Sequence, residues 1–217
     1  MSPSLAVTLI CTSMAAASCW AEVAAVQVPV PVPAQTPAST SAPVYVHGEP
    51  PLQGLGGALD LITHKGKAFS LRDIQGAPAL VFFGFTQCSN TCPLAMAQVK
   101  QLLTHFQSRK PPAVVFVTLD PLSDTPSVLA QYLAPFDPRI VGLTGSPKQI
   151  EQATRRYGVT TQQSQAPLAH SSRWYLLDGR GQLARVYKID TPASAMAQDI
   201  VRAQSQHLAS TLNAKLP

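Results

Sequence analysis

Two near-continuous hydrophobic runs, Ala79–Phe85 and Ala113–Leu119, stand out in the middle of the chain. Such runs are typical of strands buried on both faces of a sheet. Between them, apolar residues from Ala95 to Phe106 recur three and four positions apart, which is the spacing of a helix with one buried face. A strand, a helix and a strand in this order predict a parallel βαβ unit with a right-handed crossover.

Similar patterns flank this unit. Before it we expect an N-terminal hairpin, and after it two helices, a second hairpin with its turn at Asp178–Gly181, and a closing helix. The expected elements are strands Leu59–Thr63, Ala68–Leu71, Arg173–Leu177 and Gln182–Tyr187, with helices Pro126–Leu133, Pro147–Tyr157 and about Pro192 to Leu212. The sequence therefore predicts one α/β domain with a central mixed sheet flanked by helices.

Four helices share one type of start, in which a capping residue precedes a proline at the first helical position. The pairs are Thr125-Pro126, Ser146-Pro147, Thr191-Pro192 and Cys92-Pro93. This pattern places Cys92 at an N-cap, where its sulfur would meet unpaired backbone N–H groups at the positive end of the helix dipole. We therefore expect Cys92 to have a low pKa and to be reactive or ready to bind a metal ion.

The N-terminal part of the chain lacks Lys and Arg and begins with a short apolar run, Leu5–Ala17. This run is too short to span a bilayer as a helix and ends in small residues, as the core of a signal peptide does. Ala16-Ala17-Ser18-Cys19 also resembles a lipoprotein box, in which Cys19 would carry a lipid. We predict that residues 1–21 are a signal peptide or lipoprotein leader, and that the protein is exported to a bacterial periplasm, soluble or anchored by lipid.

Residues 22–54 are rich in proline, with seven prolines between Val28 and Pro51 among Ala, Ser, Thr and Gln. Such a segment cannot bury a core and should be extended. We predict a flexible tether over residues 22–54 and a folded domain over residues 55–217. A leader segment without a role of its own is the alternative.

The charged residues argue against one class of partner. The chain carries 16 Lys and Arg and 11 Asp and Glu, for a net charge of +5. These charges are scattered, without the basic stripe or interleaved aromatic residues typical of nucleic-acid binding. We therefore expect no nucleic-acid partner, and we expect the domain to be a monomer.

Cys88 and Cys92 are the most informative pair in the chain, because they stand where an apolar strand gives way to a helix. Two sulfurs this close can close a disulfide or hold a soft metal ion. A structural disulfide is the simplest alternative, since exported proteins use them. Such a disulfide stabilises most when it closes a long loop, however, and this loop is minimal.

A soft metal ion held by two thiolates needs a third ligand, and the sequence offers five histidines. His47, His64, His105 and His207 fall in the tether, in a hairpin turn or on helices, where histidines are usually ordinary surface or core groups. His170 differs, because it precedes the strand Arg173–Leu177, which a thioredoxin-like sheet would bring beside the cysteines. Cys88, Cys92 and His170 suit copper, with Cu(I) favoured and Cu(II) as the alternative, better than zinc, which requires a fourth ligand.

Several short motifs resemble, in order and spacing, those of the Sco/SenC family over about Leu55 to Leu212. The motifs are Gly84–Cys88 with Cys92-Pro93, Val117–Pro121 with Asp124–Pro126, Phe136–Pro138, Gly142–Gly145, His170-Ser171 and Leu177-Asp178. The resemblance implies a thioredoxin-like fold that binds copper through Cys88, Cys92 and His170. It also implies a role in assembling the dinuclear copper centre of cytochrome c oxidase, with a membrane-bound acceptor such as subunit II. Asp120 matches a family acidic residue near the site, and a turn residue before Pro121 is the alternative.

The sequence also departs from the family pattern at the site. Ser89 and Asn90 stand where family members commonly have proline and an acidic residue, and Ala169 stands where they commonly have Asp before the histidine. The missing charges should affect a hydrogen bond to His170, or the support of Cu(II), before they affect the three ligands. Family members are usually held by a transmembrane helix, and the sequence shows none.

Two main functions follow. The first is an exported metallochaperone that delivers copper to, or prepares the thiols of, the copper site of cytochrome c oxidase. The second is a thiol-disulfide oxidoreductase of exported proteins, in which Cys88 attacks if it is the more exposed and Cys92 resolves the mixed disulfide. The N-cap placement instead makes Cys92 the lower-pKa thiol. A peroxidase that uses Cys92, and a redox-sensing role, are further alternatives.

Overall fold

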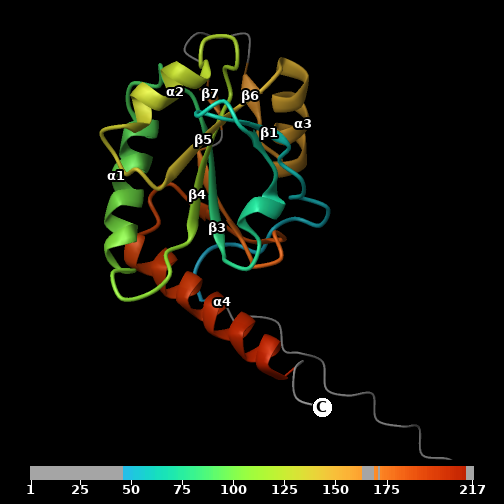
Figure 1. Ribbon diagram of the computed structural model, residues 1–217, viewed down its shortest axis with the longest axis vertical. Helices are drawn as coiled ribbons and strands as arrows, with labels where there is room; N and C mark the ends of the chain where they lie inside the picture. Colours follow the sequence, from blue (N-terminus) through green and yellow to red (C-terminus); the bar gives the residue numbers. More distant parts are fainter. Residues whose placement is uncertain (1–45, 163–168, 171, 214–217) are drawn as a thin grey trace, which may run out of the picture. The chain divides into compact units, whose positions relative to one another are not determined.

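A seven-stranded mixed sheet, in the order β2-β1-β5-β4-β3-β8-β9, forms the centre of the computed structural model (Figure 1). Residues 46–162, 169–170 and 172–213 are described, and they belong to one compact unit, Thr40–Pro217. The predicted leader, with Cys19, and most of the predicted tether lie outside the described residues. Their division at residues 21 and 54 stays a prediction.

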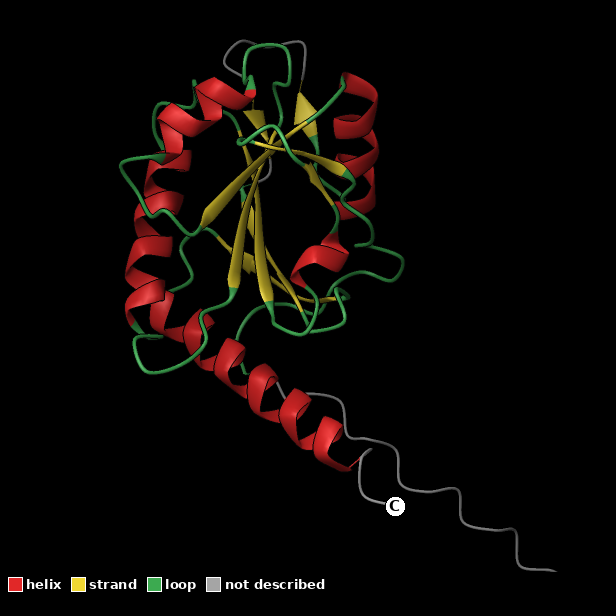
Figure 2. Ribbon diagram, viewed as in Figure 1, coloured by secondary structure: helices red, strands yellow, loops and turns green. Residues whose placement is uncertain are grey.

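The predicted mixed α/β fold is confirmed (Figure 2). The strands are β1 Leu61–Thr63, β2 Ala68–Phe69, β3 Ala79–Gly84, β4 Ala113–Thr118, β5 Ile140–Thr144, β6 Thr161–Gln162, β7 Ala169–His170, β8 Arg173–Leu177 and β9 Leu183–Lys188. The helices are the 3-10 helix η1 Leu71–Ile74 and the α-helices α1 Thr91–Thr104, α2 Pro126–Leu133, α3 Pro147–Tyr157 and α4 Ala193–Asn213. None of the described helices is both long and apolar enough to cross a membrane.

The two hydrophobic runs form the centre of the sheet, as predicted. β3 and β4 pair in parallel through α1, with Ala79 opposite Ala113 and Gly84 opposite Thr118. β5 continues the parallel part beside β4, whereas β8 joins β3 in the antiparallel direction. The loops after β3 and β4 therefore leave the sheet side by side at the C-terminal ends of these strands. This is where open α/β sheets place their ligands.

Helices cover both faces of the sheet, and each face has its own core. On one face α1, α2 and α4 pack on a core that includes Phe82, Phe116 and Trp174. On the other face α3 and η1 pack on Val81, Phe83 and their neighbours. Because successive strand residues point to opposite faces, the continuous apolar runs supply both cores at once.

Local capping determines where most helices begin. Ser146 caps α3 with a capping box, and the Thr125 hydroxyl accepts a hydrogen bond from the Val128 N–H at the start of α2. The predicted N-cap at Cys92 is wrong. α1 begins at Thr91 after Asn90, so that Cys92 and Pro93 lie inside its first turn. Proline is tolerated there because the N–H groups of the first turn have no partner within the helix.

The first described residues are held against the edge of the sheet. The backbone N–H groups of Val46 and His47 donate to the carboxylate of Asp199 at 2.8 and 2.9 Å, and the Tyr187 hydroxyl donates to the same carboxylate at 3.1 Å. Glu49 then forms a β-bridge with Val186 of the edge strand β9. This segment covers backbone groups that an exposed edge strand would otherwise offer to another chain.

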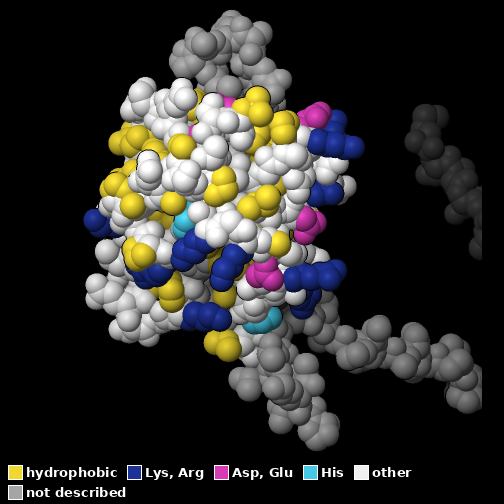
Figure 3. All heavy atoms as spheres, turned by 45° about the horizontal axis from the view of Figure 1, so that its top comes forward, with side chains coloured by type: hydrophobic (Ala, Val, Ile, Leu, Met, Phe, Trp, Pro, Cys, Tyr) yellow, Lys and Arg dark blue, Asp and Glu magenta, His cyan; other side chains and the backbone are white. Residues whose placement is uncertain are grey.

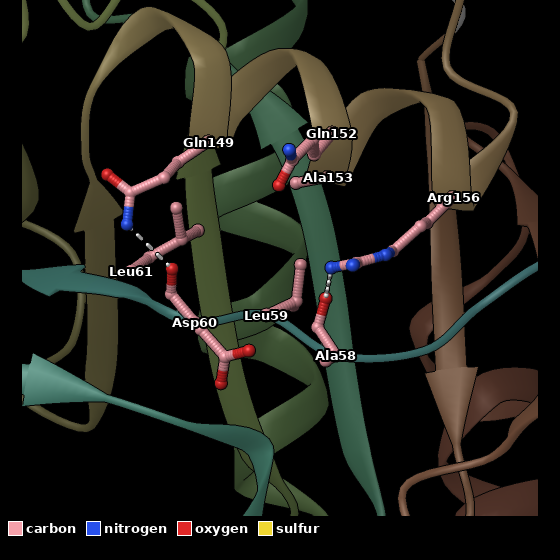
Figure 4. A pocket seen from close by; sticks show the side chains of 8 residues that line it. All are labelled: Ala58, Leu59, Asp60, Leu61, Gln149, Gln152, Ala153 and Arg156. Carbon is pink, nitrogen blue, oxygen red and sulfur yellow. Dashed lines mark hydrogen bonds between the residues drawn. The ribbon is translucent and has the colours of Figure 1, made fainter.

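A hollow of about 150 Å³ lies where the extended segment Ala58–Leu61 crosses α3 (Figure 4). Gln149 Nε2 donates to the Asp60 carbonyl oxygen at 3.1 Å, and Arg156 Nη1 donates to the Ala58 carbonyl oxygen at 2.9 Å. The lining contains no cysteine or histidine. These contacts join α3 to the segment before β1, so we interpret the hollow as a structural junction.

Candidate metal and thiol site

The loop from β3 to α1 brings Cys88 and Cys92 together, as the sequence predicts. Both are free thiols. The Cys92 backbone N–H donates to Cys88 Sγ at 3.4 Å, and the two thiols also interact directly. The expected proximity is confirmed, and the structure holds no disulfide between them.

Cys88 has the environment that the sequence predicted for Cys92. Its partial burial raises the pKa of the thiol, but the backbone N–H groups of Cys92, Asn90 and Thr91 and the Cys92 thiol lower it, and the net shift is downward. These N–H groups belong to the start of α1, where an anion is favoured. The argument from the helix terminus is therefore correct, but it applies to the sulfur of Cys88.

Cys92 is fully buried, and the prediction that it has a low pKa is wrong. Burial is the main cause that raises the pKa of its thiol far above the ordinary range. The charges of Cys88 and Asp124 raise it further, while a backbone hydrogen bond from Phe85 opposes the shift. The site therefore pairs a partly exposed sulfur that favours the thiolate with a buried sulfur that favours the thiol.

Gly84 leaves the space that the buried sulfur of Cys92 occupies. A Cβ atom added to Gly84 would stand 2.7 Å from Cys92 Sγ and 3.0 Å from Cε2 of Phe116. No side chain larger than hydrogen fits there without displacing the sulfur. The glycine at the end of β3 thus lets the sulfur lie against the sheet, next to the aromatic core.

Asp124 is a residue of the site that the sequence reasoning missed. Its carboxylate is fully buried and accepts hydrogen bonds from Thr86 N at 3.1 Å, Thr86 Oγ1 at 2.6 Å and Thr118 Oγ1 at 2.5 Å. It fixes the loop two residues before Cys88 to the end of β4. One signal in the sequence pointed to it, since Asp124 directly precedes the helix start Thr125-Pro126 in one of the family motifs.

Asp120, which was expected near the site, has the contacts of a turn residue. Its N–H donates to Thr118 Oγ1 at 2.9 Å, its carboxylate accepts from Ser123 N at 3.3 Å, and its carbonyl oxygen accepts from Asp124 N at 2.8 Å. These contacts shape the loop that presents Asp124. A role of Asp120 toward a bound metal ion stays a prediction.

Tyr132 of α2 lies near Cys88, Cys92 and Asp124. Its ring packs against Phe116 and Phe136, with centroid distances of 5.7 and 5.6 Å. Its hydroxyl oxygen is buried and has no hydrogen-bond partner among the described residues. Burial, followed by the charges of Cys92, Cys88 and Asp124, raises the pKa of this hydroxyl. Tyr132 therefore remains a neutral phenol beside the thiols.

His170 lies in the short strand β7, where it pairs with Thr161 of β6. Trp174, four residues later, pairs with Phe82 in β3, two residues before Gly84. The backbone thus returns to the end of the sheet that carries the cysteine loop, and β7 and α2 lie at the same end of the molecule (Figure 1). The side chain of His170 lies outside what the structure describes, so its role as third ligand stays a prediction.

The other histidines make contacts away from the cysteines. His64 Nδ1 accepts a hydrogen bond from Gly142 N at 3.0 Å, and His47 Nε2 lies 3.3 Å from the Gln198 side-chain oxygen. His105 ends α1, and the ring of His207 lies against Gly179. Within the described ranges, no group of three His, Cys, Asp or Glu side chains could hold a metal ion.

The donors that are present fit a soft monovalent or divalent ion. The described side chains supply two sulfurs, one of which already favours the thiolate, and β7 brings an imidazole-bearing residue back to the same edge of the sheet. Thiolate and imidazole ligands suit copper, and Cu(I) is satisfied with three of them. This chemistry is compatible with copper as a cargo and with redox chemistry of the thiols.

Comparison with known proteins shows which family this chain resembles. The SCO1/SenC family matches residues 48–205. The SCO2-like protein of Rickettsia felis is 32% identical over 145 residues, which cover 63% of this chain and 71% of that protein.

Solved structures agree as well. The copper-bound structure of Bradyrhizobium japonicum ScoI matches with a TM-score of 0.62 and 28% identity, over 69% of this chain and 99% of the other. BsSco, described as a Sco protein with a disulfide switch, shares the fold with a TM-score of 0.63 at 23% identity, over 73% and 98% of the two chains. The chain therefore belongs to the SCO1/SenC family and has its thioredoxin-like fold.

Proposed function

We propose that this protein is an exported copper-binding metallochaperone in which Cys88, Cys92 and His170 hold copper. The observation that supports this most directly is the arrangement of two free sulfurs with opposite pKa shifts at the end of β3. Relatives that share this fold have been solved with copper bound, among them ScoI of Bradyrhizobium japonicum. Copper is the cargo in this proposal, and it leaves by exchange of ligands with an acceptor.

The proposed acceptor is a membrane-bound copper protein such as subunit II of cytochrome c oxidase. BsSco is described as a member of a family of cytochrome c oxidase assembly proteins, and this chain shares its fold. Leu94, directly after Cys92-Pro93, and Leu122, in the loop before Asp124, are 62% and 80% exposed. Apolar side chains exposed beside the thiols give an acceptor protein a surface to contact.

The surface charges fit contact with a protein partner. On the face shown in Figure 3, few charged side chains lie in the upper left part, whereas most Lys and Arg side chains lie in the lower part and at the right. The proposed location is the bacterial periplasm, with the N-terminal segment as leader and tether and Cys19 as the site of a lipid anchor. Mass spectrometry of the native protein tests the leader, the lipid and any retained copper together.

Anaerobic Cu(I) titration tests the copper site. Replacement of a ligand should weaken binding by more than the tenfold or so that the loss of an outer hydrogen-bond partner typically causes. We therefore expect Cys88→Ser, Cys92→Ser and His170→Ala each to bind Cu(I) at least about tenfold more weakly than the wild type. His64→Ala is a matched control, since His64 bonds to Gly142 away from the cysteines. Equal affinity of all variants would exclude the proposal.

A thiol-disulfide reductase is the second candidate, and the difference between the two thiols favours it. Cys88 is partly exposed and its pKa is lowered, which suits the attacking sulfur, while the buried Cys92 suits the sulfur that resolves the mixed disulfide. In this reaction Cys88 breaks the disulfide of the target and forms a mixed disulfide. Cys92 then releases the target as a dithiol and leaves Cys88 and Cys92 oxidised.

The metal-free protein distinguishes the two functions. A reductase should reduce a disulfide-bonded acceptor peptide without copper, and Cys92→Ser should accumulate the mixed disulfide through Cys88. A metallochaperone without reductase activity should leave the peptide oxidised and still transfer Cu(I) to its reduced form.

A further inference from the structure

The most unusual charged group at the cysteine loop is the carboxylate of Asp124. It is fully buried, yet none of the described Lys, Arg and His side chains forms an ion pair with it. Its partners are neutral: the N–H and hydroxyl of Thr86 and the hydroxyl of Thr118. A buried charge without a counter-charge is costly, so a protein that keeps one at a functional site is expected to use it.

The groups around Asp124 are hydrogen-bond donors of the kind that a carboxylate accepts from. The N–H of Thr86 can only donate. The hydroxyl of Thr118 donates to Asp124 Oδ2, and its oxygen accepts the Asp120 N–H at 2.9 Å. An ionised carboxyl group accepts hydrogen bonds and donates none, and the observed donors all point toward it.

The charge lies close to the sulfur of Cys92. Thr118, which donates to Asp124, pairs with Gly84 in the sheet. A Cβ at Gly84 would stand 2.7 Å from Cys92 Sγ, so the sulfur and the carboxylate occupy neighbouring positions at the ends of two paired strands. The Asp124 charge also contributes to the raised pKa of Cys92 and of Tyr132.

The charge of the copper site depends on the oxidation state of the metal ion. Both sulfurs bind either ion as thiolates. The bis-thiolate complex then carries one net negative charge with Cu(I) and none with Cu(II). A fixed negative charge nearby repels the first complex and leaves the second unaffected, so it favours the divalent ion.

We propose that Asp124 is a specificity-determining residue whose buried negative charge shifts the preference of the dithiol site from Cu(I) toward Cu(II). This inference rests on the proposed copper site. It does not require contact between Asp124 and the metal ion, because the charge of a buried carboxylate acts through space. Asp124 thereby opposes the intrinsic preference of two thiolates and an imidazole for Cu(I).

The test compares Asp124→Asn with the wild type in the full-length chain. Asparagine keeps the shape and can still accept from Thr86, but it removes the charge. We expect the Cu(I) dissociation constant to fall relative to that of Cu(II), with a change in their ratio of at least about tenfold, estimated for unit charges several ångströms apart at an effective dielectric constant near 20. For this one-electron couple, a tenfold change raises the Cu(II)/Cu(I) potential by about 59 mV.

Asp199→Asn is the matched control. Asp199 is also fully buried and also accepts three hydrogen bonds, which come from the N–H groups of Val46 and His47 and the hydroxyl of Tyr187. We expect this variant to leave the ratio of the two copper affinities unchanged. An equal shift in both variants, or a parallel loss of both affinities in Asp124→Asn, would overturn the inference in favour of a purely structural role.

Two further measurements separate the inference from the proposed function. Asp124→Glu keeps the charge while it disturbs the hydrogen bonds, so it should keep the wild-type ratio even if it is less stable. Titration with Ag(I) and Cd(II) compares a monovalent with a divalent thiophilic ion, whatever the natural cargo is. If the wild type does not bind copper tightly, the proposed function fails, and the Ag(I)-to-Cd(II) ratio in Asp124→Asn still supports or overturns the role of the charge.

Discussion

Two fully buried carboxylates, those of Asp124 and Asp199, each accept hydrogen bonds from a segment outside the helices and strands, but they differ in the charges around them. Asp124 binds Thr86 at the start of the cysteine loop, and Asp199 of α4 binds Val46 and His47 at the start of the described chain. Arg202 lies 3.9 Å from Asp199, whereas Asp124 forms no ion pair with any described residue. Both carboxylates therefore attach a segment of the chain through hydrogen bonds, but only Asp124, which has no ion-pair partner among the described residues, lies beside the thiols.

The largest effect should come from removal of either carboxylate. Asp124→Ala and Asp199→Ala each leave three hydrogen-bond donors without their acceptor, and each donor that stays shielded from water costs roughly 1–3 kcal/mol. We expect both variants to lose about 3 kcal/mol of unfolding free energy in urea denaturation. Limited proteolysis should distinguish them, because only Asp199→Ala releases the segment before Glu49. Cleavage of that segment in both variants would contradict the division of roles.

Two glycines test how tightly each region is packed. A Cβ at Gly84 would meet Cys92 Sγ at 2.7 Å, and a Cβ at Gly48, which has a φ of 74°, would meet the Tyr187 ring at 2.6 Å. We expect Gly84→Ala and Gly48→Ala each to cost about 1–3 kcal/mol, because overpacking displaces the neighbouring side chain. Only Gly84→Ala should also change the reactivity of the thiols, which a thiol titration of the folded protein measures.

The two thiols should differ in reactivity and in pH dependence. Cys92→Ser leaves the accessible Cys88, and Cys88→Ser leaves the buried Cys92. We expect iodoacetamide to react with Cys88 more than about tenfold faster, since only the thiolate reacts. Because its pKa is lowered, the reaction of Cys88 should fall off only at a pH below that of an ordinary thiol. Equal rates for the two single-cysteine proteins would refute the pairing of an exposed thiolate with a buried thiol.

The same pKa shifts predict opposite contributions to stability. The lowered pKa of Cys88 stabilises the folded state above the ordinary thiol pKa, and this contribution is lost as the pH falls through the lowered value. The raised pKa of Cys92 destabilises the folded state once the pH rises above the ordinary thiol pKa. In denaturation experiments, the unfolding free energy of Cys92→Ser, which keeps Cys88, should rise with pH up to the ordinary thiol pKa and then level off. That of Cys88→Ser, which keeps Cys92, should fall as the pH rises above the ordinary thiol pKa.

The smallest effect should come from Tyr132→Phe. The hydroxyl of Tyr132 is buried and has no hydrogen-bond partner in the described part of the chain, so its removal from the metal-free protein should be neutral or stabilise it by up to about 1 kcal/mol. Tyr157→Phe is the matched control, since the hydroxyl of Tyr157 donates to the Gly57 carbonyl oxygen at 3.0 Å and its loss should destabilise the protein. Differential scanning calorimetry of both variants makes the comparison. A loss of stability in Tyr132→Phe as large as that in Tyr157→Phe would show that the hydroxyl has a partner.

The sequence predicted the fold well wherever local chemistry determines an element. Helices α2 and α3 and strand β8 have the predicted bounds, because a capping residue with proline, or a polar turn, fixes their ends. Strand β5 was missed as a strand. Gly142 interrupts its five residues, and its identity depends on pairing with β4, which no local pattern reveals.

The site was predicted less completely, for two physical reasons. Proline is tolerated throughout the first turn of a helix, so Cys92-Pro93 did not fix where α1 begins, and the two sulfurs exchanged their expected roles. Asp124 contacts Thr86 across 38 positions of sequence, a distance at which only the folded sheet brings residues together. Residue types therefore allowed a prediction of the ligands, but gave no indication of the buried carboxylate of Asp124.

The contact between the start of the described chain and α4 has a consequence for the order of folding. Val46 and Asp199 are separated by 153 positions, so closing that loop is among the most entropically demanding steps available to the chain. The partner of Val46 is made only when α4 has been synthesised. We therefore expect the segment that begins at Val46 to acquire its native structure last, after the sheet and α4 have formed.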